Sequence, residues 1–137
     1  MAMTSEEMIR FVDDLYDATG TGDWDRAASM LTDDFFVSEA DTLPMAGVYR
    51  GKNALHELFV TVMGTVDVVA LEREQTVASG DCAITILQMR FADPDLAPAQ
   101  LLEMFRFRDG KCCEIKPYYF NSATFVAAAE AKRRQTA

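Results

Sequence analysis

The sequence predicts an α+β fold in which helices gather on one side of an antiparallel sheet. The N-terminal half carries apolar residues at helical spacing, and a last helical segment ends the chain. Between them, the stretch 65–121 is rich in β-branched and aromatic residues and is interrupted by hairpin signals. The chain has 137 residues, half of them apolar, and nine are Phe, which is enough to bury one core and still enclose a small cavity. Residues 1–137 are therefore expected to form a single domain.

The first two elements are expected to be helices. Thr4 and Glu7 have the spacing of a capping box, and apolar residues then recur at helical spacing until Gly20. Asp23 can cap a second helix over residues 24–31. Because each helix carries one apolar stripe, both are expected to pack against the rest of the domain with that face.

A short strand, a loop and a third helix are expected next. Residues 35–40, "FFVSEA", have the composition of a strand. The segment 41–51 contains proline and glycine and is expected to be a loop. Residues 52–64, "KNALHELFVTVMG", align their apolar side chains at helical spacing and predict the third helix.

Four antiparallel strands and a short C-terminal helix complete the expected order. Gly80 and the "RDGK" turn at 108–111 are hairpin signals, and "ADPDLAP" makes a longer connection. Ser122 can cap a helix over residues 123–134, whose basic residues lie at the C-terminal end, where the helix dipole favours them.

Charge and composition exclude several classes of partner. Thirteen Lys and Arg against 22 Asp and Glu give a formal charge of −9, which repels nucleic acid and anionic membrane surfaces. The N-terminus lacks the pattern of a secretory signal, and no apolar run is long enough to span a bilayer. The sequence therefore predicts a soluble, cytoplasmic protein with no nucleic-acid or membrane partner.

The sequence has few of the residues that bind metal ions or form disulfides. Cys82, Cys112 and Cys113 are an odd number without metal-site spacing, and they are expected to be reduced, packed thiols. His56 is the single histidine, so a metal site would have no second nitrogen ligand. We expect neither a metal nor another cofactor.

One carboxylate stands in an apolar row of a predicted strand. In "QLLEMFRF", residues 100–107, side chains alternate between faces, which places Glu103 with Leu101 and Phe105. Burying an unpaired carboxylate costs several kcal/mol, a large share of the net stability of a domain. Either Glu103 faces water, or it faces a cavity where it is protonated, hydrogen-bonded or paired.

A second glutamate ends another apolar row. Alternation in "DDFFVSEA" places Glu39 with Phe35 and Val37. Acids on the inward rows of two strands can face one cavity. Proton-transfer sites use such pairs, with one carboxylate ionised as a base and the other kept neutral as a hydrogen-bond donor.

Three segments, quoted in chain order, carry a resemblance to a known superfamily. "GDWDRAASMLTDDFFVSEA", "AGVYRGKNALHELF" and "LLEMFRFRDGKCCEIKPYYFN" together resemble the nuclear transport factor 2-like superfamily, in particular its SnoaL-like and ketosteroid isomerase-like branches. The resemblance spans about residues 8–121. It implies a cone-shaped, curved antiparallel sheet packed on N-terminal helices, with an apolar pocket at the mouth of the cone.

The resemblance also implies roles for particular residues. In ketosteroid isomerase, the environments of two carboxyl groups set their pKa values apart. The resemblance places its general base at Glu39 and its neutral oxyanion-hole acid at Glu103. The oxyanion tyrosine of that enzyme falls by count on Leu15, with Tyr16 one step further around the helix, so that donor of the oxyanion site is expected to be missing. The catalytic aspartate of SnoaL-like cyclases corresponds to Asn121, which cannot accept a proton.

The expected pocket suits a small apolar or aromatic ligand with one or two polar handles. The residues expected to line it are Trp24, Phe35, Tyr49, Phe59, Met89, Phe105, Tyr119 and Asn121.

Three functions remain open from the sequence. One is an isomerase-, cyclase- or hydrolase-type enzyme that uses Glu39 and Glu103, and another is a non-catalytic protein that binds a small molecule. The third is an interaction module. The strand 82–91 is apolar on both faces, which predicts a homodimer formed through the sheet.

Overall fold

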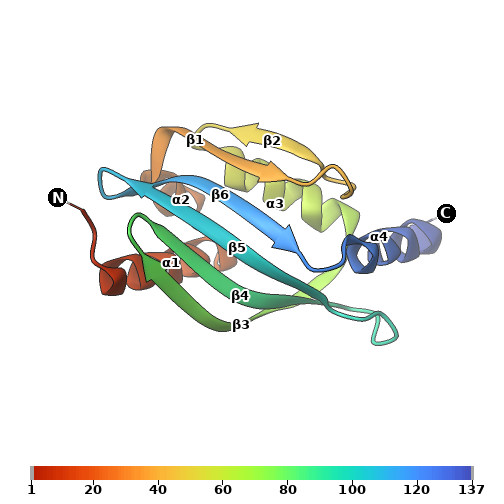
Figure 1. Cartoon of the computed structure of the whole chain (residues 1–137). Coiled ribbons are helices and arrows are strands. Elements are labelled where there is room, and N and C mark those ends of the chain that lie inside the picture. Colours follow the sequence, from red (N-terminus) through yellow and green to blue (C-terminus); the bar gives the residue numbers. More distant parts are fainter. Residues whose placement is uncertain (1, 137) are drawn as a thin grey trace.

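A single six-stranded sheet organises the molecule (Figure 1). The computed structural model describes residues 2–136. The strand order across the sheet is β2-β1-β6-β5-β4-β3. The strands are β1 (Leu31–Glu39), β2 (Gly47–Arg50), β3 (Val68–Ser79), β4 (Cys82–Phe91), β5 (Ala99–Arg108) and β6 (Lys111–Tyr119), and the helices are α1 (Ser5–Gly20), α2 (Trp24–Ser29), α3 (Ala54–Thr65) and α4 (Ser122–Thr136).

The α+β class and the curved sheet on N-terminal helices are confirmed, and the sheet is mixed rather than wholly antiparallel. β6 returns beside β1 and pairs with it in parallel, whereas the other neighbouring strands pair antiparallel. Parallel pairing requires a long connection. Here β2, α3 and the strands β3 to β5 form that connection. As a result, the first strand of the chain, β1, lies beside the last, β6.

The first strand begins earlier than expected, and the expected loop contains a strand. β1 starts at Leu31, because α2 ends at Ser29 and Met30 accepts a hydrogen bond from the Cys112 N–H at 3.0 Å. Gly47–Arg50 forms β2 by pairing with the end of β1. Such a short edge strand depends on its partner, so its four residues, which begin with Gly47 and follow a loop that contains Pro44, gave little sign of it.

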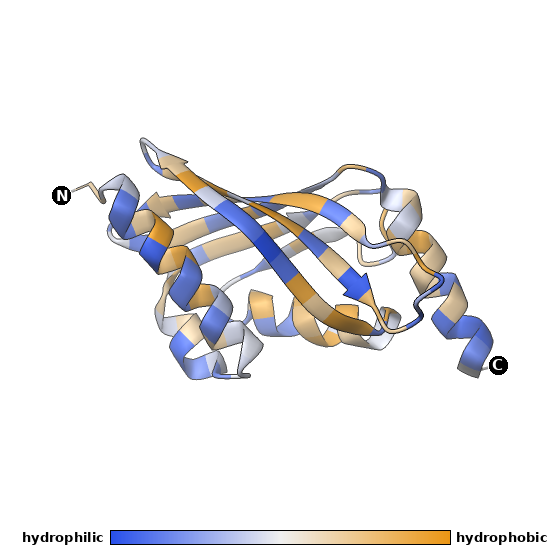
Figure 2. Ribbon diagram, turned by 90° about the horizontal axis from the view of Figure 1, so that it is seen from below, coloured by the Kyte–Doolittle hydropathy of each residue, from blue (hydrophilic) through white to orange (hydrophobic). Residues whose placement is uncertain are grey.

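The helices pack where their apolar stripes meet the sheet. α1 contacts β3 and β4, and α3 contacts β1 and β2, so both cover the concave face (Figures 1 and 2). Thr4 and Glu7 form the predicted capping box at the start of α1. α4 lies beyond the far end of the sheet. The space between the concave face, α1 and α3 is where a cavity can form.

Hairpin turns fix the register of the long strands. Asp109 and Gly110 both have positive φ, at 55° and 76°, as a type I′ turn requires. In β5 the inward row holds Leu101, Glu103, Phe105 and Phe107, and Met104 of the opposite row is also buried. The turn chemistry therefore sets which face Glu103 occupies.

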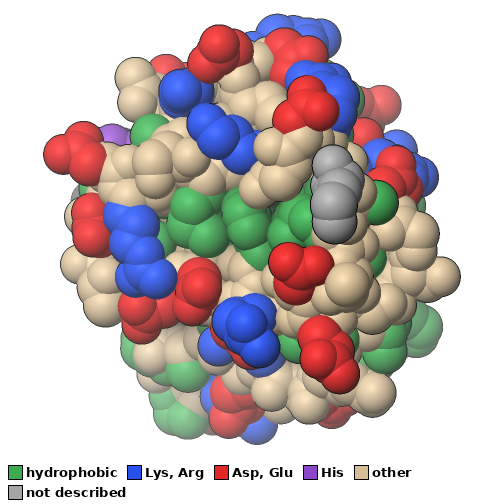
Figure 3. All heavy atoms as spheres, turned by 90° about the vertical axis from the view of Figure 1, so that its left-hand side faces the viewer, with side chains coloured by type: hydrophobic (Ala, Val, Ile, Leu, Met, Phe, Trp, Pro, Cys, Tyr) green, Lys and Arg blue, Asp and Glu red, His purple; other side chains and the backbone are tan. Residues whose placement is uncertain are grey.

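On the face shown in Figure 3, the acidic side chains do not form one continuous negative patch. Acidic and basic side chains are interspersed there around a small hydrophobic strip. Within residues 2–136, no helix combines the length and the apolarity that crossing a membrane requires.

Candidate active site

A cavity of about 160 Å³ lies between the concave face of the sheet and the helices. Its walls are mainly apolar, and the lining side chains that carry polar groups are Glu39, Glu103, Tyr16, Tyr119, Thr19 and Trp24. The lining residues are Leu15, Tyr16, Thr19, Trp24, Val37, Glu39, Leu55, Leu58, Phe59, Val62, Leu71, Leu87, Met89, Leu101, Glu103, Phe105, Ile115 and Tyr119.

Strand register explains why two glutamates reach one cavity. Glu103 on β5 is level with Pro117 on β6. Continuing the parallel register from Val37 and Ile115 places Glu39 level with the other side of Pro117. Two interstrand spacings separate the glutamate backbones by about 10 Å, and the curvature of the sheet turns both side chains inward.

Glu103 is held by a tyrosine from α1. The Tyr16 hydroxyl donates a hydrogen bond to Glu103 Oε1, and its ring packs edge-on against Phe105 with 5.8 Å between ring centroids. The Arg73 guanidinium lies 4.6 Å from the centre of the Tyr16 ring and pairs with Asp13 at 2.8 Å. Burial and the charge of Glu103 raise the pKa of Tyr16, so the phenol remains protonated and acts as a donor.

A tyrosine contacts Glu103, although the count placed Leu15 at the position of the oxyanion tyrosine. Counting back from the Gly-Asp pair selects Leu15, but both Leu15 and Tyr16 line the cavity. Consecutive positions differ by about 100° around a helix, so the surface of α1 that faces the cavity is wide enough to include both side chains. Tyr16 follows Met8 and Val12 at intervals of four residues, so the apolar stripe of α1 predicts its inward position better than the count does.

Glu39 has no compensating donor. Its side chain is 7% exposed, and among the described residues its Oε1 is the buried polar side-chain atom without a hydrogen-bond partner. Burial, and then the charge of Glu103, raise the pKa of Glu39 from an ordinary 4.5 to about 8. A proton exchangeable near neutral pH therefore faces an apolar cavity.

The two carboxyls are not equivalent. Burial also raises the pKa of Glu103, but the Tyr16 hydrogen bond opposes this effect by stabilising the ionised form. Glu39 lacks such a bond at Oε1. Glu103 is thus the better place for the first negative charge, and that charge makes ionisation of Glu39 harder.

Five of the eight predicted lining residues surround the carboxyls. Tyr119 belongs to the same row as Leu101, and burial together with the charges of Glu39 and Glu103 raises its pKa, so its phenol is another donor. Trp24 lies at the α3 side of the cavity, where His56 stacks on it at 4.5 Å between ring centroids. The five residues are Trp24, Phe59, Met89, Phe105 and Tyr119.

The other three predicted lining residues lie elsewhere. Phe35 is fully buried in the core, because its row enters the packed end of the sheet before reaching the cavity at Val37. The Tyr49 hydroxyl on β2 donates to the Met45 carbonyl at 2.8 Å, which connects β2 to the preceding loop. Asn121 is exposed, and its Oδ1 accepts from the Ala123 N–H at 3.0 Å at the start of α4.

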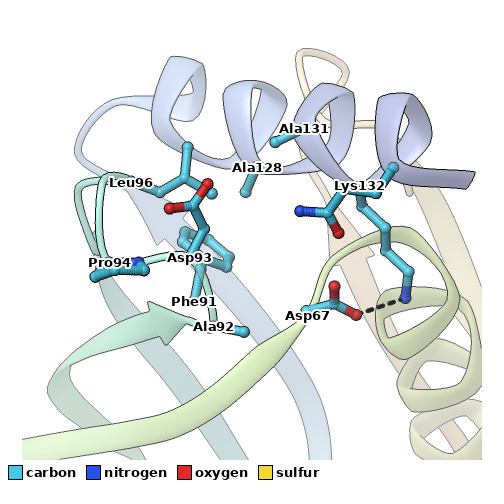
Figure 4. A pocket seen from close by; sticks show the side chains of 10 residues that line it. Asp67, Phe91, Ala92, Asp93, Pro94, Leu96, Ala128, Ala131 and Lys132 are labelled. Atoms are coloured by element: carbon cyan, nitrogen blue, oxygen red, sulfur yellow. Dashed lines mark ion pairs between the residues drawn. The ribbon is translucent and has the colours of Figure 1, made fainter.

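A second hollow, of about 270 Å³, lies between α4 and the β4–β5 connection (Figure 4). The Lys132 ammonium group crosses one side of it to Asp67 at 3.0 Å and also donates to the Met63 carbonyl at 2.7 Å. Its acids are solvent-facing, unlike those of the Glu39–Glu103 cavity. Throughout residues 2–136, no group of three or more His, Cys, Asp or Glu side chains is arranged to hold a metal ion.

Fold and site together define an α+β cone with an acid-containing apolar pocket. The sequence profile of the SnoaL-like domain matches residues 12–115, and the chain belongs to this family. Comparison with curated proteins finds no match.

Solved structures of the wider NTF2-like superfamily have the same fold. An NTF2-like protein from Burkholderia xenovorans is 21% identical, with a TM-score of 0.79 over 93% of this chain and 99% of its own. TerC, co-crystallised with polyporic acid, is 15% identical, with a TM-score of 0.75 over 90% and 98%. A putative polyketide cyclase from Sinorhizobium meliloti is 19% identical, with a TM-score of 0.67 over 85% and 100%. At these identities the similarity establishes the fold.

Proposed function

We propose that this protein is a cofactor-independent enzyme that moves a proton on a small, mainly apolar carbonyl compound. The observation that carries the proposal is the unpartnered Glu39 carboxyl, buried beside a second carboxyl in one cavity. General acid–base groups work best when their pKa lies near the working pH. Glu39, with a pKa of about 8, meets that condition.

Glu39 and Glu103 divide the work through a shared proton. Before the substrate binds, the Tyr16 hydrogen bond favours charge on Glu103 and a proton on Glu39. A substrate carbonyl can only accept a hydrogen bond, so contact with Glu103 favours the form in which Glu103 is protonated. That form leaves Glu39 ionised. Glu39 then removes a proton from the carbon next to the carbonyl, and the Glu103 O–H holds the developing enolate oxygen.

The cavity volume selects for ligand size. An engineered protein cavity of roughly 150 Å³ holds one benzene molecule. The present cavity, about 160 Å³, therefore suits a one-ring compound. Aromatic side chains from α2, α3 and β5 supply flat walls for such a ring, and they include Trp24, Phe59 and Phe105.

Structural relatives support a ring-shaped, oxygenated ligand. TerC was co-crystallised with polyporic acid, and the Sinorhizobium meliloti protein is described as a putative polyketide cyclase. Ligands larger than one ring require a lining side chain to move. Phe59 is 42% exposed, so its side chain has room to move.

Hydrogen exchange tests the proposal without knowledge of the natural substrate. Cyclohexanone and cyclohexane-1,3-dione in deuterium oxide serve as probes, and NMR follows exchange of the hydrogens next to the carbonyl. We expect catalysed exchange that falls about 100-fold or more in Glu39→Gln, while the affinity for the ketone is retained. The matched control Glu57→Gln, at an exposed position on α3, is expected to keep the full rate.

A non-catalytic binding role is the second candidate. With a pKa of about 8, about nine in ten Glu39 carboxyls are protonated at pH 7, so the two carboxyls then carry at most one negative charge, on Glu103. Ketones that bind without any exchange, in the native protein as in Glu39→Gln, would support binding alone and contradict the proton-transfer role.

A further inference from the structure

Tyr119 lines the cavity, and its hydroxyl has no hydrogen-bond partner among the described residues. The other hydroxyl donors of the cavity are in use. Tyr16 donates to Glu103 Oε1, and Thr19 donates to the Tyr16 carbonyl at 3.2 Å. The Tyr119 donor is therefore available to a ligand that carries an acceptor oxygen.

Strand register places Tyr119 beside both carboxyls. β6 lies between β1 and β5, and its residue Pro117 is level with Glu103 and, by continuation of the parallel register, with Glu39. Tyr119 is two residues further along β6, so it shares the inward face and is a diagonal neighbour of each glutamate. In an antiparallel pair such as β5 and β6, diagonal neighbours lie roughly 7–8 Å apart, which is within reach of an aromatic side chain.

A buried phenylalanine holds the Tyr119 ring in place. The ring packs edge-on against Phe125 of α4, with 5.9 Å between ring centroids, and Phe125 is fully buried. Burial, followed by the charges of Glu39 and Glu103, raises the pKa of Tyr119, so the phenol keeps its proton. A donor that is in place before the ligand binds needs little reorganisation during the reaction.

Trp24 is the other lining residue whose N–H or O–H donor makes no hydrogen bond within residues 2–136. Its indole belongs to α2 and packs against His56 and Phe59 of α3. Tyr119 instead belongs to the strand between the two carboxyls. Tyr119 is therefore the better placed donor for a ligand oxygen that contacts Glu103.

We propose that Tyr119 is a further catalytic residue, whose hydroxyl donates a hydrogen bond to the same ligand oxygen that Glu103 contacts. A carbonyl oxygen has two lone pairs and can accept both bonds. Tyr16 does not make this contact, because its single hydroxyl proton lies on Glu103. The catalytic role rests on the function proposed above, whereas the hydrogen bond to a bound ketone does not.

The two donors meet the charge that proton transfer creates. As Glu39 takes the proton from the carbon next to the carbonyl, the C–H electron pair forms a carbon–carbon double bond. The π pair of the carbonyl group moves onto the oxygen, which becomes an enolate oxygen. The hydrogen bonds from Glu103 and Tyr119 strengthen as that charge develops, so they stabilise the transition state more than the bound ketone.

Carbon-13 NMR of a bound ketone tests the hydrogen bond without turnover. The probe is cyclohexanone labelled at the carbonyl carbon, whose signal moves downfield when the oxygen accepts hydrogen bonds. At saturation we expect a smaller downfield shift in Tyr119→Phe, which keeps the ring against Phe125, than in the native protein. The matched control Tyr118→Phe, at a 51% exposed position on the opposite face of β6, is expected to match the native protein.

Hydrogen-exchange kinetics test the catalytic role. Removal of one oxyanion donor typically lowers kcat about 100-fold or more. For cyclohexanone in deuterium oxide we expect a loss of that size in Tyr119→Phe. KM should change only a few-fold, since the bond is stronger in the transition state than in the bound ketone. Tyr118→Phe is expected to keep the full rate.

A measurement on the native protein does not depend on how the variants fold. With carbon-13 at Cζ of every tyrosine, we expect the Tyr119 signal to move when cyclohexanone binds, because its hydroxyl gains an acceptor. The exposed Tyr118 signal is expected to stay in place. A change confined to Tyr16 would contradict the choice of donor.

The outcomes separate this proposal from the proposed function. Equal carbonyl shifts in the native protein and Tyr119→Phe would overturn the proposal, and so would a shift that is lost in Trp24→Phe instead. A carbonyl shift that depends on Tyr119, in the absence of any exchange, would support the hydrogen bond and overturn the proposed function. Exchange that Glu39→Gln abolishes and Tyr119→Phe leaves intact would overturn the catalytic role of Tyr119 alone.

Discussion

At the scale of single residues, Glu39 dominates the behaviour of the site. Its neutral form is the stable one in the folded protein, because burial removes the water that stabilises a carboxylate. A short alternating pattern in "DDFFVSEA" was enough to identify it, since alternation assigns a face to each side chain.

Glu39 gives the stability of the protein a specific pH dependence. Its folded pKa of about 8 exceeds the unfolded value near 4.5, so the folded state binds more protons between these limits. Its contribution is therefore fully present below about pH 4.5 and is lost as the pH rises through 8. Urea unfolding at pH 5, 7 and 9 is expected to show a decline of a few kcal/mol that is smaller in Glu39→Gln, where the raised pKa of Glu103 still contributes. A native protein as stable at pH 9 as at pH 5 would contradict this assignment.

Alternation predicted on which side of a strand a side chain lies, but it did not predict whether that side chain lies in the packed core or in the cavity. Glu103, Phe105, Met89 and Tyr119 were placed correctly by alternation, but Phe35 shares the row of Glu39 and still lies in the core. The alternation of a strand does not say where along it the packed core ends and the cavity begins. That boundary depends on which helix lies opposite each row.

At the scale of elements, α1 supports the proposed catalytic carboxyl Glu103. It delivers Tyr16 to Glu103, and its N-terminus is fixed by bonds between Thr4 and Glu7 of 2.9 and 3.1 Å. The capping box and the stop at Gly20 could be read from sequence because they are local. Strand β2 and the parallel β1–β6 pair could not, since both depend on distant partners.

Removal of the α1 cap is expected to lower the stability of the protein without changing the titration of Glu39. Thr4→Ala is expected to lower the free energy of unfolding by about 1 kcal/mol, because one orphan N–H of the helix loses its acceptor. Thr4→Ser keeps the acceptor and is expected to lose much less. Thermal unfolding gives the stability, and the Glu39 titration midpoint should not move in either variant. A changed midpoint in Thr4→Ala would mean that the cap also sets the geometry of the site.

At the scale of the whole molecule, the convex face of the sheet remains available for a partner. Ile86, Leu102 and Tyr118 are paired across β4, β5 and β6 in one outward row. Leu102 is 41%, Tyr118 51% and nearby Phe120 84% exposed. The prediction of a homodimer through the sheet therefore stays a prediction, and this row is where its interface is expected.

Light scattering at low protein concentration checks the dimer. We expect the mass of two chains for the native protein and of one chain for Leu102→Glu, since a charge in an apolar interface costs several kcal/mol. Glu39→Gln, on the opposite face of the sheet, should remain a dimer. A native mass of one chain would rule out the interface.

Glu39 and Glu103 line one mainly apolar cavity, and the carboxyl carbon of Glu39 reports on this arrangement directly. Its carbon-13 titration is predicted to have a midpoint near pH 8 in the native protein. In Glu103→Gln the midpoint should fall, because the neighbouring charge is gone, yet stay above the ordinary value because burial persists. A midpoint near 4.5 in both proteins would contradict the shared site.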